Sequence, residues 1–527
     1  MRKKVFWFVF FIAILLRFYG LGKVPPSLDW DEASNAYNAY SILKTGKDEH
    51  GRFLPLYNQS FGDYKPPLYM YLEIPVVAVF GLTAFSARLP SAVFGSLTVL
   101  FIYLLVNRLH KRESISNVSM FLAAITPWLL HFSRVGFEAN IGLFFTVSSF
   151  TILLYSLAVN KEKLTKLKIT LFLLSSVFFG LSFYSYHAQR VFVPILLIIT
   201  TIIYRHEILK FPKIFLLAFI TVIFLVIAPF FIQSPKEAIL QRFQVTGSAS
   251  KLQNTETSIR YIQEDNISQV SKIIHNRRIT IAVGYLQNYF ANLDPNYIFM
   301  KGDDNLRHHI EGAGMIYAIL LPFFLYGTFL YIKQHTKDAL FIFAWLLISP
   351  IPAAVTNVAP HAIRSYLLVI PILTIASAAI VDIYRTIKWK RAYLFTLALG
   401  ILISFFSYIH NYFVHYPYGS GSWWQWGYVQ AAQETGHYKG LYRKIIIDPS
   451  IEQAYIFWLF GTKYDPDMYQ KTGNSNQFDN FYFSSQKPVD SNELLVTAAG
   501  SLPQGYEIVN TIAYPNGNPG ILIGYPK

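Results

Sequence analysis

Long apolar runs alternate with short polar connections along most of the chain, a pattern typical of membrane-spanning helices. A helix needs roughly 20 apolar residues to cross a bilayer core of about 30 Å. We expect eleven spans, near 5–21, 89–109, 115–132, 139–159, 169–186, 191–204, 214–232, 314–332, 339–355, 366–383 and 392–409. The pattern therefore predicts an all-α polytopic membrane protein with about 11 transmembrane helices.

Composition agrees with this prediction. The 527 residues are 53% hydrophobic and only 14% charged, which is more apolar and less charged than a soluble globular domain usually is. A net charge of +15 raises the question of nucleic acid, but the basic residues fall in short clusters between apolar runs, so we expect no nucleic-acid partner. The absence of cysteine excludes disulfides, cysteine metal sites and thiol catalysis.

Positive residues in the connections predict the side of the membrane, because short cytoplasmic loops carry an excess of Lys and Arg. Alternate connections are basic, and they contain Arg2, Lys3, Lys4, Arg108, Lys111, Arg112, Lys161, Lys163, Lys166, Lys168, Arg205, Lys210, Lys213, Lys333, Lys337, Arg385, Lys388, Lys390 and Arg391. The three short turns on the other side contain one Arg each, at Arg134, Arg190 and Arg364. We therefore expect a cytoplasmic N-terminus and, after an odd number of spans, a C-terminus outside.

The N-terminal segment MRKKVFWFVFFIAILLRFYG has a basic head and an apolar stretch, as a signal peptide does. No small-residue cleavage site follows Leu16, and many spans come after it. We therefore expect a retained first helix and a multi-pass protein of the cell membrane.

Three larger pieces are predicted to lie outside the membrane, at 22–86, 233–313 and 411–527. In the last piece, RKIIIDPSIEQAYIFWLFG predicts a strand and then a helix, and ELLVTAAG, YEIVNTIAY and GILIGYP predict further strands between Gly and Pro turns. The pattern indicates two domains: a transmembrane domain at 1–410 and a small extracytoplasmic α/β domain at 411–527.

Acidic and basic residues recur together in the outer connections, whereas the spans contain almost none away from their ends. The outer segments SLDWDEASNAY, FGDYKPPLYMYL, HFSRVGFEAN, YSYHAQR, NLRHH and APHAIRS contain Asp29, Asp31, Glu32, Asp63, Lys65, Arg134, Glu138, His187, Arg190, His308, His309, His361 and Arg364. A carboxylate can accept a proton from an attacking hydroxyl, while Lys and Arg hold a phosphate and offset its charge. The expected substrate is a lipid phosphate at the membrane surface.

These motifs resemble a known family. The pair Asp31-Glu32 follows the first span, KPPL begins at Lys65, RLPSAVFG opens the second span, and Arg134 and Glu138 lie between the third and fourth spans. This combination resembles the polyprenyl-phosphate-sugar-dependent transferases, which include the protein O-mannosyltransferases and the lipid A aminoarabinose transferases. Their GT-C fold is the one that the resemblance implies here, and HAIRSYLLVIP is a weaker match further along the chain.

The resemblance implies a glycosyltransferase that takes a sugar from a polyprenyl-phosphate donor and delivers it, with inversion, to a protein, glycan or lipid acceptor on the outer face of the membrane. Asp31 is then the general base, Glu32 supports its geometry, and Glu138 orients the acceptor or the sugar. The donor phosphate is assigned to Lys65, Arg134, Arg190 and Arg364, with His187, His361 and Asp63 as additional candidates. This chain has Tyr64 before the Lys and Glu138 as the second acid, where members of the family often have Glu and Asp.

Plainer interpretations of these residues stay open. Acids favour the first turn of a helix, so Asp31 and Glu32 fit an ordinary helix start, and Asp29 fits a solvated or capping residue. Arg134 and Glu138 have the spacing of a helical ion pair. Two acids around one phosphate permit a divalent cation, Mg²⁺ or Mn²⁺, without requiring it, and Asp31 and Glu138 are then its ligands. His187, His308, His309 and His361 could also ligate a metal, but no two of them form a motif such as HExxH, and adjacent histidines in a polar loop are usually solvated.

Two other functional classes compete with a transferase. A polytopic transporter or lipid flippase predicts ionisable residues near the middle of the bilayer and usually internal symmetry, and the sequence shows neither. A noncatalytic membrane scaffold predicts that the outer acids are dispensable. The outer acids therefore distinguish the three classes.

Overall fold

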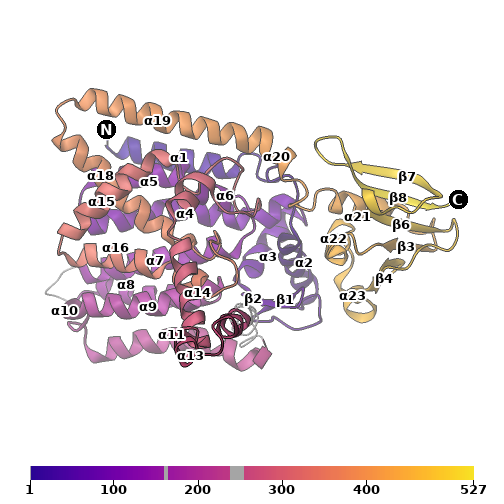
Figure 1. Ribbon diagram of the computed structural model, residues 1–527, viewed down its shortest axis with the longest axis horizontal. Coiled ribbons are helices and arrows are strands. Elements are labelled where there is room, and N and C mark those ends of the chain that lie inside the picture. Colours follow the sequence, from indigo (N-terminus) through magenta and orange to yellow (C-terminus); the bar gives the residue numbers. More distant parts are fainter. Residues whose placement is uncertain (1, 159–163, 238–254) are drawn as a thin grey trace.

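The protein consists of a helical bundle with a β-sheet at one end (Figure 1). The computed structural model describes residues 2–158, 164–237 and 255–527. The N-terminus lies at one end of the bundle, and the C-terminus lies in the sheet beyond the opposite end. The long helices run roughly parallel to the line between these two ends, as expected for helices that cross a membrane together.

Helices lie at all eleven predicted places. They are α1 (Arg2–Phe18), α4 (Ala84–His110), α5 (Glu113–Ile125) with α6 (Pro127–Phe132), α7 (Glu138–Ala158), α8 (Lys166–Phe183), α9 (His187–Ile203), α11 (Lys213–Gln233), α15 (Leu321–Lys333), α16 (Lys337–Ile348), α18 (Val369–Thr386) and α19 (Lys390–His410). Within the described part of the chain, seven helical segments are long and apolar enough to cross a membrane, and several others are shorter. The count of eleven spans therefore stays a prediction.

The centre of the bundle is formed by α7 and α18, whose side chains are almost all buried, whereas α11 and α19 lie at its edge. Pro127 starts α6 directly after Thr126, which ends α5, so the third predicted span is two helices rather than one. A proline lacks the N–H that would continue the helix but is tolerated at a first helical position.

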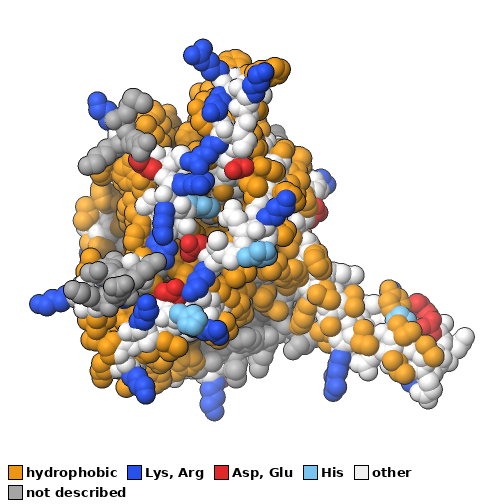
Figure 2. Space-filling model, turned by 90° about the vertical axis from the view of Figure 1, so that its left-hand side faces the viewer, with side chains coloured by type: hydrophobic (Ala, Val, Ile, Leu, Met, Phe, Trp, Pro, Cys, Tyr) orange, Lys and Arg blue, Asp and Glu red, His pale blue; other side chains and the backbone are white. Residues whose placement is uncertain are grey.

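The end of the bundle opposite the sheet is rich in Lys and Arg and poor in acids (Figure 2). Connections predicted to be cytoplasmic lie there, among them the ends of α4 and α18 with Arg108 and Arg385. This arrangement agrees with the expected charge asymmetry, and the assignment of this end to the cytoplasm stays a prediction. Lys161 and Lys163 lie outside the described residues.

The first piece predicted to lie outside, at 22–86 and called the first outer piece below, carries α2 (Trp30–Thr45), a hairpin of β1 (Asn58–Ser60) and β2 (Asp63–Lys65), and α3 (Leu68–Phe80). α3 is an apolar helix that the sequence analysis did not predict, because 13 residues are too few to span a bilayer and two prolines precede it. Pro66 and Pro67 end the strand, and Leu68 then donates its backbone N–H to the carbonyl of Tyr184 at 3.2 Å. α2 and α3 lie between the bundle and the sheet (Figure 1).

The second outer piece contains a helix at 255–264, then α13 (Gln269–Ile274), α14 (Arg277–Ala291) and the π-helical turn η1 (Asn296–Lys301). α14 crosses the long helices (Figure 1), and none of its side chains is buried. Residues 238–254 of the predicted outer loop 233–313 lie outside the described residues. Short helices α10 (Arg205–Ile208) and α17 (Ile351–Ala354) and the 3-10 turns η2 (Ala318–Leu320) and η3 (Tyr366–Leu368) complete the bundle.

The C-terminal region is built around a six-stranded sheet in the order β4-β5-β3-β6-β8-β7. Its elements are α21 (Tyr428–His437), β3 (Lys444–Ile447), α22 (Ala454–Gly461), α23 (Pro466–Thr472), β4 (Gln477–Phe478), β5 (Phe481–Phe483), β6 (Glu493–Ala498), the 3-10 turn η5 (Ala499–Ser501), β7 (Tyr506–Ala513) and β8 (Pro519–Pro526). β3 is parallel to β5 and β6, and the other pairs are antiparallel. The predicted strands and helix are confirmed.

The boundary of the predicted domains at 410/411 is not marked by a break, because the π-helical turn η4 (Asn411–His415) and α20 (Tyr416–Gly419) continue α19 to Gly419. α2 packs against α22 and α23, and the Tyr37 hydroxyl donates to the carbonyl of Tyr464 at 3.2 Å. The sheet region is therefore attached directly to the segment that contains Asp31. The division into domains at 1–410 and 411–527 stays a prediction.

Candidate active site

A cavity of about 350 Å³, called the outer cavity below, opens at the end of the bundle next to the sheet, which is the end predicted to lie outside. The start of α2, the hairpin strand β2, the first residues of α7 and α9, and two loops at 302–310 and 359–365 surround it. Its charged lining residues are Asp29, Asp31, Asp63, Lys65, Glu138, Arg307 and Arg364. Acids from three separate segments thus converge with three cations in one space.

Lys65 and Asp31 form an ion pair inside this cavity. The Lys65 side chain is 11% exposed and that of Asp31 is 35% exposed, so the carboxylate faces the open space more than the ammonium does. Burial alone would lower the pKa of Lys65, but the charges of Asp31 and Glu138 outweigh it and raise the pKa. Lys65 is therefore a fixed positive charge with a neighbouring carboxylate that solvent or substrate can reach.

Glu138 begins α7 and contributes the second acid of the cavity. Asn35 of α2 donates to Glu138 Oε1 at 3.0 Å, and Asn58 of β1 donates to Asn35 Oδ1 at 2.7 Å. This chain of amides connects three elements. Asn35 and Glu138 are 103 residues apart in sequence, and their hydrogen bond holds Glu138 at the cavity, close enough to Lys65 for the two charges to interact.

Glu32 points into the protein rather than into the cavity. Its carboxylate accepts from Arg88 Nε at 2.9 Å and Nη2 at 3.1 Å, and from the backbone N–H of Gly136 at 2.7 Å. Both charged side chains are fully buried. A Cβ at position 136 would lie 2.9 Å from Glu32 Cγ, so the glycine permits this close approach. Glu32 thus joins the start of α2 to α4 and to the turn before α7, directly behind Asp31.

Asp29 is the N-cap of α2 and forms a capping box with Glu32, so the capping interpretation is confirmed. The solvated interpretation is wrong, because Asp29 is only 1% exposed. Burial, followed by the charges of Asp31 and Glu32, raises the pKa of Asp29 to about 7, against the opposing effect of Arg307.

The raised pKa of Asp29 predicts a pH-dependent stability. The ordinary value is 3.8, so the folded protein binds this proton more tightly than the unfolded chain does, and stability falls as pH rises from about 4 to about 7. Asp29→Asn keeps a good N-cap without the charge. We expect the melting temperature of the variant, relative to wild type, to rise between pH 5 and 7 and then level off. Parallel melting curves for the two proteins across this range would contradict the assignment.

The three predicted phosphate-binding arginines lie in different environments. Arg364 lines the cavity and donates to Thr356 Oγ1 at 2.7 Å. Arg190 lies beside the cavity-lining His187, with its guanidinium 4.5 Å from the Phe183 ring centroid. Arg134 is fully buried in the turn between α6 and α7 and donates to the carbonyls of Leu16, Arg17, Tyr19 and Val24. Only Arg364 therefore reaches the cavity, and the helical ion pair between Arg134 and Glu138 is wrong.

The additional candidates His187, His361 and Asp63 all line the cavity. Arg307, which the sequence analysis did not single out, lines it as well. Arg307 lies with its guanidinium 4.7 Å from the Trp30 ring centroid and 3.9 Å from Asp29 Oδ2. In the sequence, the segment NLRHH stands out for its histidines. Its arginine, Arg307, is brought next to α2 by the fold.

A larger cavity of about 750 Å³ lies between the turn at Phe61 and the C-terminal sheet region. Ser60 and Phe61 line both cavities, so the two are neighbours. The larger one is lined by few charged groups, including Asp448 and Glu452, and by no Lys or Arg. We therefore place the reacting groups in the smaller cavity.

Comparisons with known proteins agree with this geometry. The structure is similar to ArnT from Cupriavidus metallidurans bound to undecaprenyl phosphate, with 11% identity, a TM-score of 0.59, and 98% of this chain and 97% of that chain covered. It is also similar to the archaeal oligosaccharyltransferase AglB from Archaeoglobus fulgidus in complex with an inhibitory peptide and a dolichol-phosphate, with 13% identity, a TM-score of 0.53, and 87% of this chain and 63% of that chain covered. The chain has the fold of the GT-C glycosyltransferases.

Residues 64–232 match the family model described as dolichyl-phosphate-mannose-protein mannosyltransferase. The matched segment contains Lys65, Glu138 and Arg190, and the resemblance that the sequence motifs indicate is confirmed. This chain spans 63% of the length of the AglB chain in that complex. No curated protein matches the chain.

Proposed function

We propose that the protein is a membrane glycosyltransferase that transfers a sugar from a polyprenyl-phosphate donor to an acceptor hydroxyl in the outer cavity, with inversion at the anomeric carbon. The observation that supports the proposal most is the placement of Asp31 and Lys65 together with Glu138 and Arg364 in one cavity at the bundle end. Acids and cations in one such space suit proton abstraction beside a departing phosphate.

Lys65 and Arg364 hold the donor phosphate in this proposal, and Arg307 adds a third positive charge. When a phosphate binds Lys65, it replaces Asp31 as the partner of the ammonium. The Asp31 carboxylate is then available to accept the proton of the attacking hydroxyl. As the bond from the anomeric carbon to the phosphate oxygen breaks, the cations stabilise the charge that develops on the leaving phosphate.

Glu138 and Glu32 have separate roles in the proposed reaction. Glu138 faces the cavity from α7 and orients the acceptor or the sugar. Glu32 does not touch the cavity, and it positions Asp31 through the Arg88 ion pair and the capping box. The acceptor belongs to the class of proteins, glycans or lipids on the outer side of the cell membrane, with the N-terminus of the protein cytoplasmic and its C-terminal region outside.

Donor binding tests the assignment of Lys65. Undecaprenyl phosphate is the probe, and its affinity for the detergent-purified protein is measured with wild type, Lys65→Ala and Asp31→Asn. A hydrogen bond to a charged group contributes about 1.5–3 kcal/mol, so we expect Lys65→Ala to weaken binding about 10- to 100-fold. Asp31→Asn removes a competitor for the ammonium and should retain binding.

The matched control is Lys23→Ala, which removes an exposed lysine from the same outer piece of the chain. It should bind undecaprenyl phosphate as wild type does. Equal affinity for wild type and Lys65→Ala would remove Lys65 from the phosphate site.

A further inference from the structure

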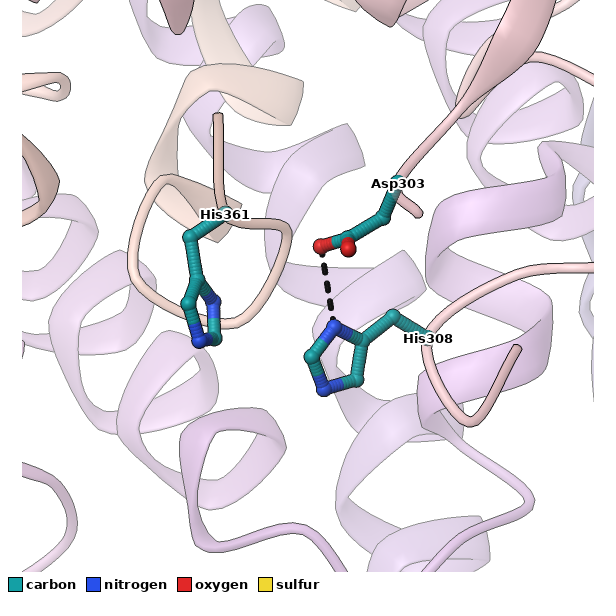
Figure 3. Close-up of side chains that lie close together, drawn as sticks. All are labelled: Asp303, His308 and His361. Carbon is teal, nitrogen blue, oxygen red and sulfur yellow. Dashed lines mark hydrogen bonds and ion pairs between the residues drawn. The ribbon is translucent and has the colours of Figure 1, made fainter. Parts of the chain in front are cut away.

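The side chains of Asp303, His308 and His361 lie close together in a second cluster (Figure 3), and two of them line the outer cavity. One ligand atom from each residue lies within 4.8 Å of the other two. His308 and His361 line the cavity, whereas Asp303 lies behind them and is 6% exposed. The side chains converge from two loops that are more than fifty residues apart in sequence.

The carboxylate of Asp303 is held firmly by its neighbours. Its Oδ1 accepts from the backbone N–H of Asn305 at 2.9 Å, and its Oδ2 accepts from the backbone N–H of Ala362 at 2.6 Å and from His308 Nδ1 at 2.9 Å. The residue before Ala362 is His361, whose own N–H donates to Asn292 Oδ1 at 3.1 Å. Backbone contacts therefore fix the separation of the two loops that supply the three side chains.

We propose that Asp303, His308 and His361 bind a divalent transition-metal ion, with Zn²⁺ the best match. Two imidazoles and one carboxylate are a common ligand set for zinc, which binds nitrogen at about 2.0–2.1 Å and carboxylate oxygen at about 2.0–2.2 Å. Tetrahedral bonds of that length place the ligand atoms roughly 3.3–3.5 Å apart. The present separations of up to 4.8 Å are close to this value, so small side-chain rotations would bring the three ligand atoms to a shared ion.

The remaining coordination position faces the cavity, because the two histidines form part of its lining. Ligands available there are oxygens: water, a phosphate oxygen or a hydroxyl. A three-ligand zinc site that keeps one position open is the arrangement of catalytic rather than structural zinc. The ion would also join the loop that carries Arg307 to the loop that carries Arg364.

This site differs from the one expected from the sequence, where Asp31 and Glu138 were the ligands. The ammonium of Lys65 already lies against Asp31, and its raised pKa reflects the nearby charge of Glu138. Those two carboxylates thus share a positive charge supplied by the chain itself. The proposal for Asp303, His308 and His361 does not depend on sugar transfer, because it concerns metal binding alone.

Metal content of the full-length protein tests the site. The detergent-purified protein is stripped with a chelator, equilibrated with Zn²⁺ and analysed by mass spectrometry for bound metal, with affinity measured by competition with a zinc indicator. We expect one Zn²⁺ per chain in wild type, and at least about a tenfold loss of affinity in His308→Ala and His361→Ala. The matched control is His309→Ala, since His309 neighbours His308 but is not part of the cluster.

Cobalt gives an independent readout of the same ligands. Co²⁺ in a tetrahedral site of nitrogen and oxygen ligands absorbs visible light, so the wild-type spectrum should change on binding and Asp303→Asn should lose that change. Size-exclusion profiles and helical content identify variants that fold, and His308→Gln serves if His308→Ala does not. The proposal is overturned if wild type does not bind Zn²⁺ stoichiometrically, or if the folded His308 and His361 variants bind it equally well. The cluster would then be a hydrogen-bonded contact between two loops and no metal site.

Discussion

Replacement of Asp31 by asparagine is expected to lower sugar transfer at least about 100-fold while the protein stays folded. General-base catalysis typically contributes 10²- to 10⁴-fold, and an amide of the same shape cannot accept the proton. The side chain is 35% exposed, and its ion-pair partner within the described part of the chain is Lys65. The ammonium of Lys65 still has Glu138 nearby, so the substitution leaves little buried charge without a counter-charge. Activity is measured as the transfer of labelled sugar from lipid-linked donors that are extracted from the membranes of the source cells.

Asp304→Asn is the matched control for this experiment. Asp304 is an exposed acid in the outer loop next to Asp303, and its replacement removes the same charge without touching the cavity lining. Transfer by this variant should equal that of wild type. If the Asp31 variant binds undecaprenyl phosphate and still transfers sugar at the wild-type rate, Asp31 is not the base.

The second large effect concerns the buried ion pair behind the site. Arg88→Ala leaves Glu32 fully buried without its counter-charge and removes hydrogen bonds to the carbonyls of Pro25 and Ser27. Loss of one partner of a buried pair costs about 3–5 kcal/mol, so we expect the free energy of unfolding to fall by that amount. Unfolding in a denaturing detergent, followed by circular dichroism, measures the change.

Arg112→Ala provides the comparison, because Arg112 is exposed at the opposite end of α4 and its replacement should change the free energy by no more than about 0.5 kcal/mol. If Arg88→Ala unfolds as wild type does, the ion pair between Arg88 and Glu32 does not stabilise the start of α2. The account would then lose its explanation of how Asp31 is positioned.

The membrane-spanning helices could be predicted from the sequence because the bilayer itself requires a continuous apolar run of a given length. The strands of the C-terminal region could be predicted because β-branched runs such as that of β3 stand between turn residues. α3 could not, since its 13 residues are too few to span a bilayer and do not form a β-branched run between turn residues. In the structure α3 packs against α2 and α4, and the backbone N–H of Leu68 is bound to the carbonyl of Tyr184.

The candidate site was predicted in part. Asp31, Lys65 and Glu138 were assigned to one side of the membrane from charge patterning alone, and the cavity contains all three. The roles of Asp31 and Glu32 came from the family resemblance, because two adjacent acids at a helix start look equivalent in the residue pattern. In the structure these neighbours point in different directions, Glu32 toward Arg88 and Asp31 toward Lys65. Arg134 is assigned to the donor phosphate by the resemblance, but its long side chain donates instead to backbone carbonyls at the end of α1.

Arg307 and Asp303 depend on contacts between loops that sequence spacing does not encode. Arg307 lies beside Trp30, and Asp303 lies beside His361, in each case across a large separation in the chain. Packing of the loop at 302–310 against α2 places Arg307 in the cavity, and packing of the same loop against the loop at 359–365 places Asp303 behind its lining. The sequence of the loop at 302–310, which is polar and contains two adjacent histidines, does not indicate this packing.

Sugar transfer at the outer surface is the central claim, and mass spectrometry of the cell-envelope glycans, glycoproteins and glycolipids tests it most directly. Envelopes are compared from cells that lack the protein and from the same cells supplied with wild type or with Asp31→Asn. The account predicts a molecule heavier by one sugar that is present with wild type and absent in the other two. Identical spectra from all three, with the protein present in the membrane, would contradict it.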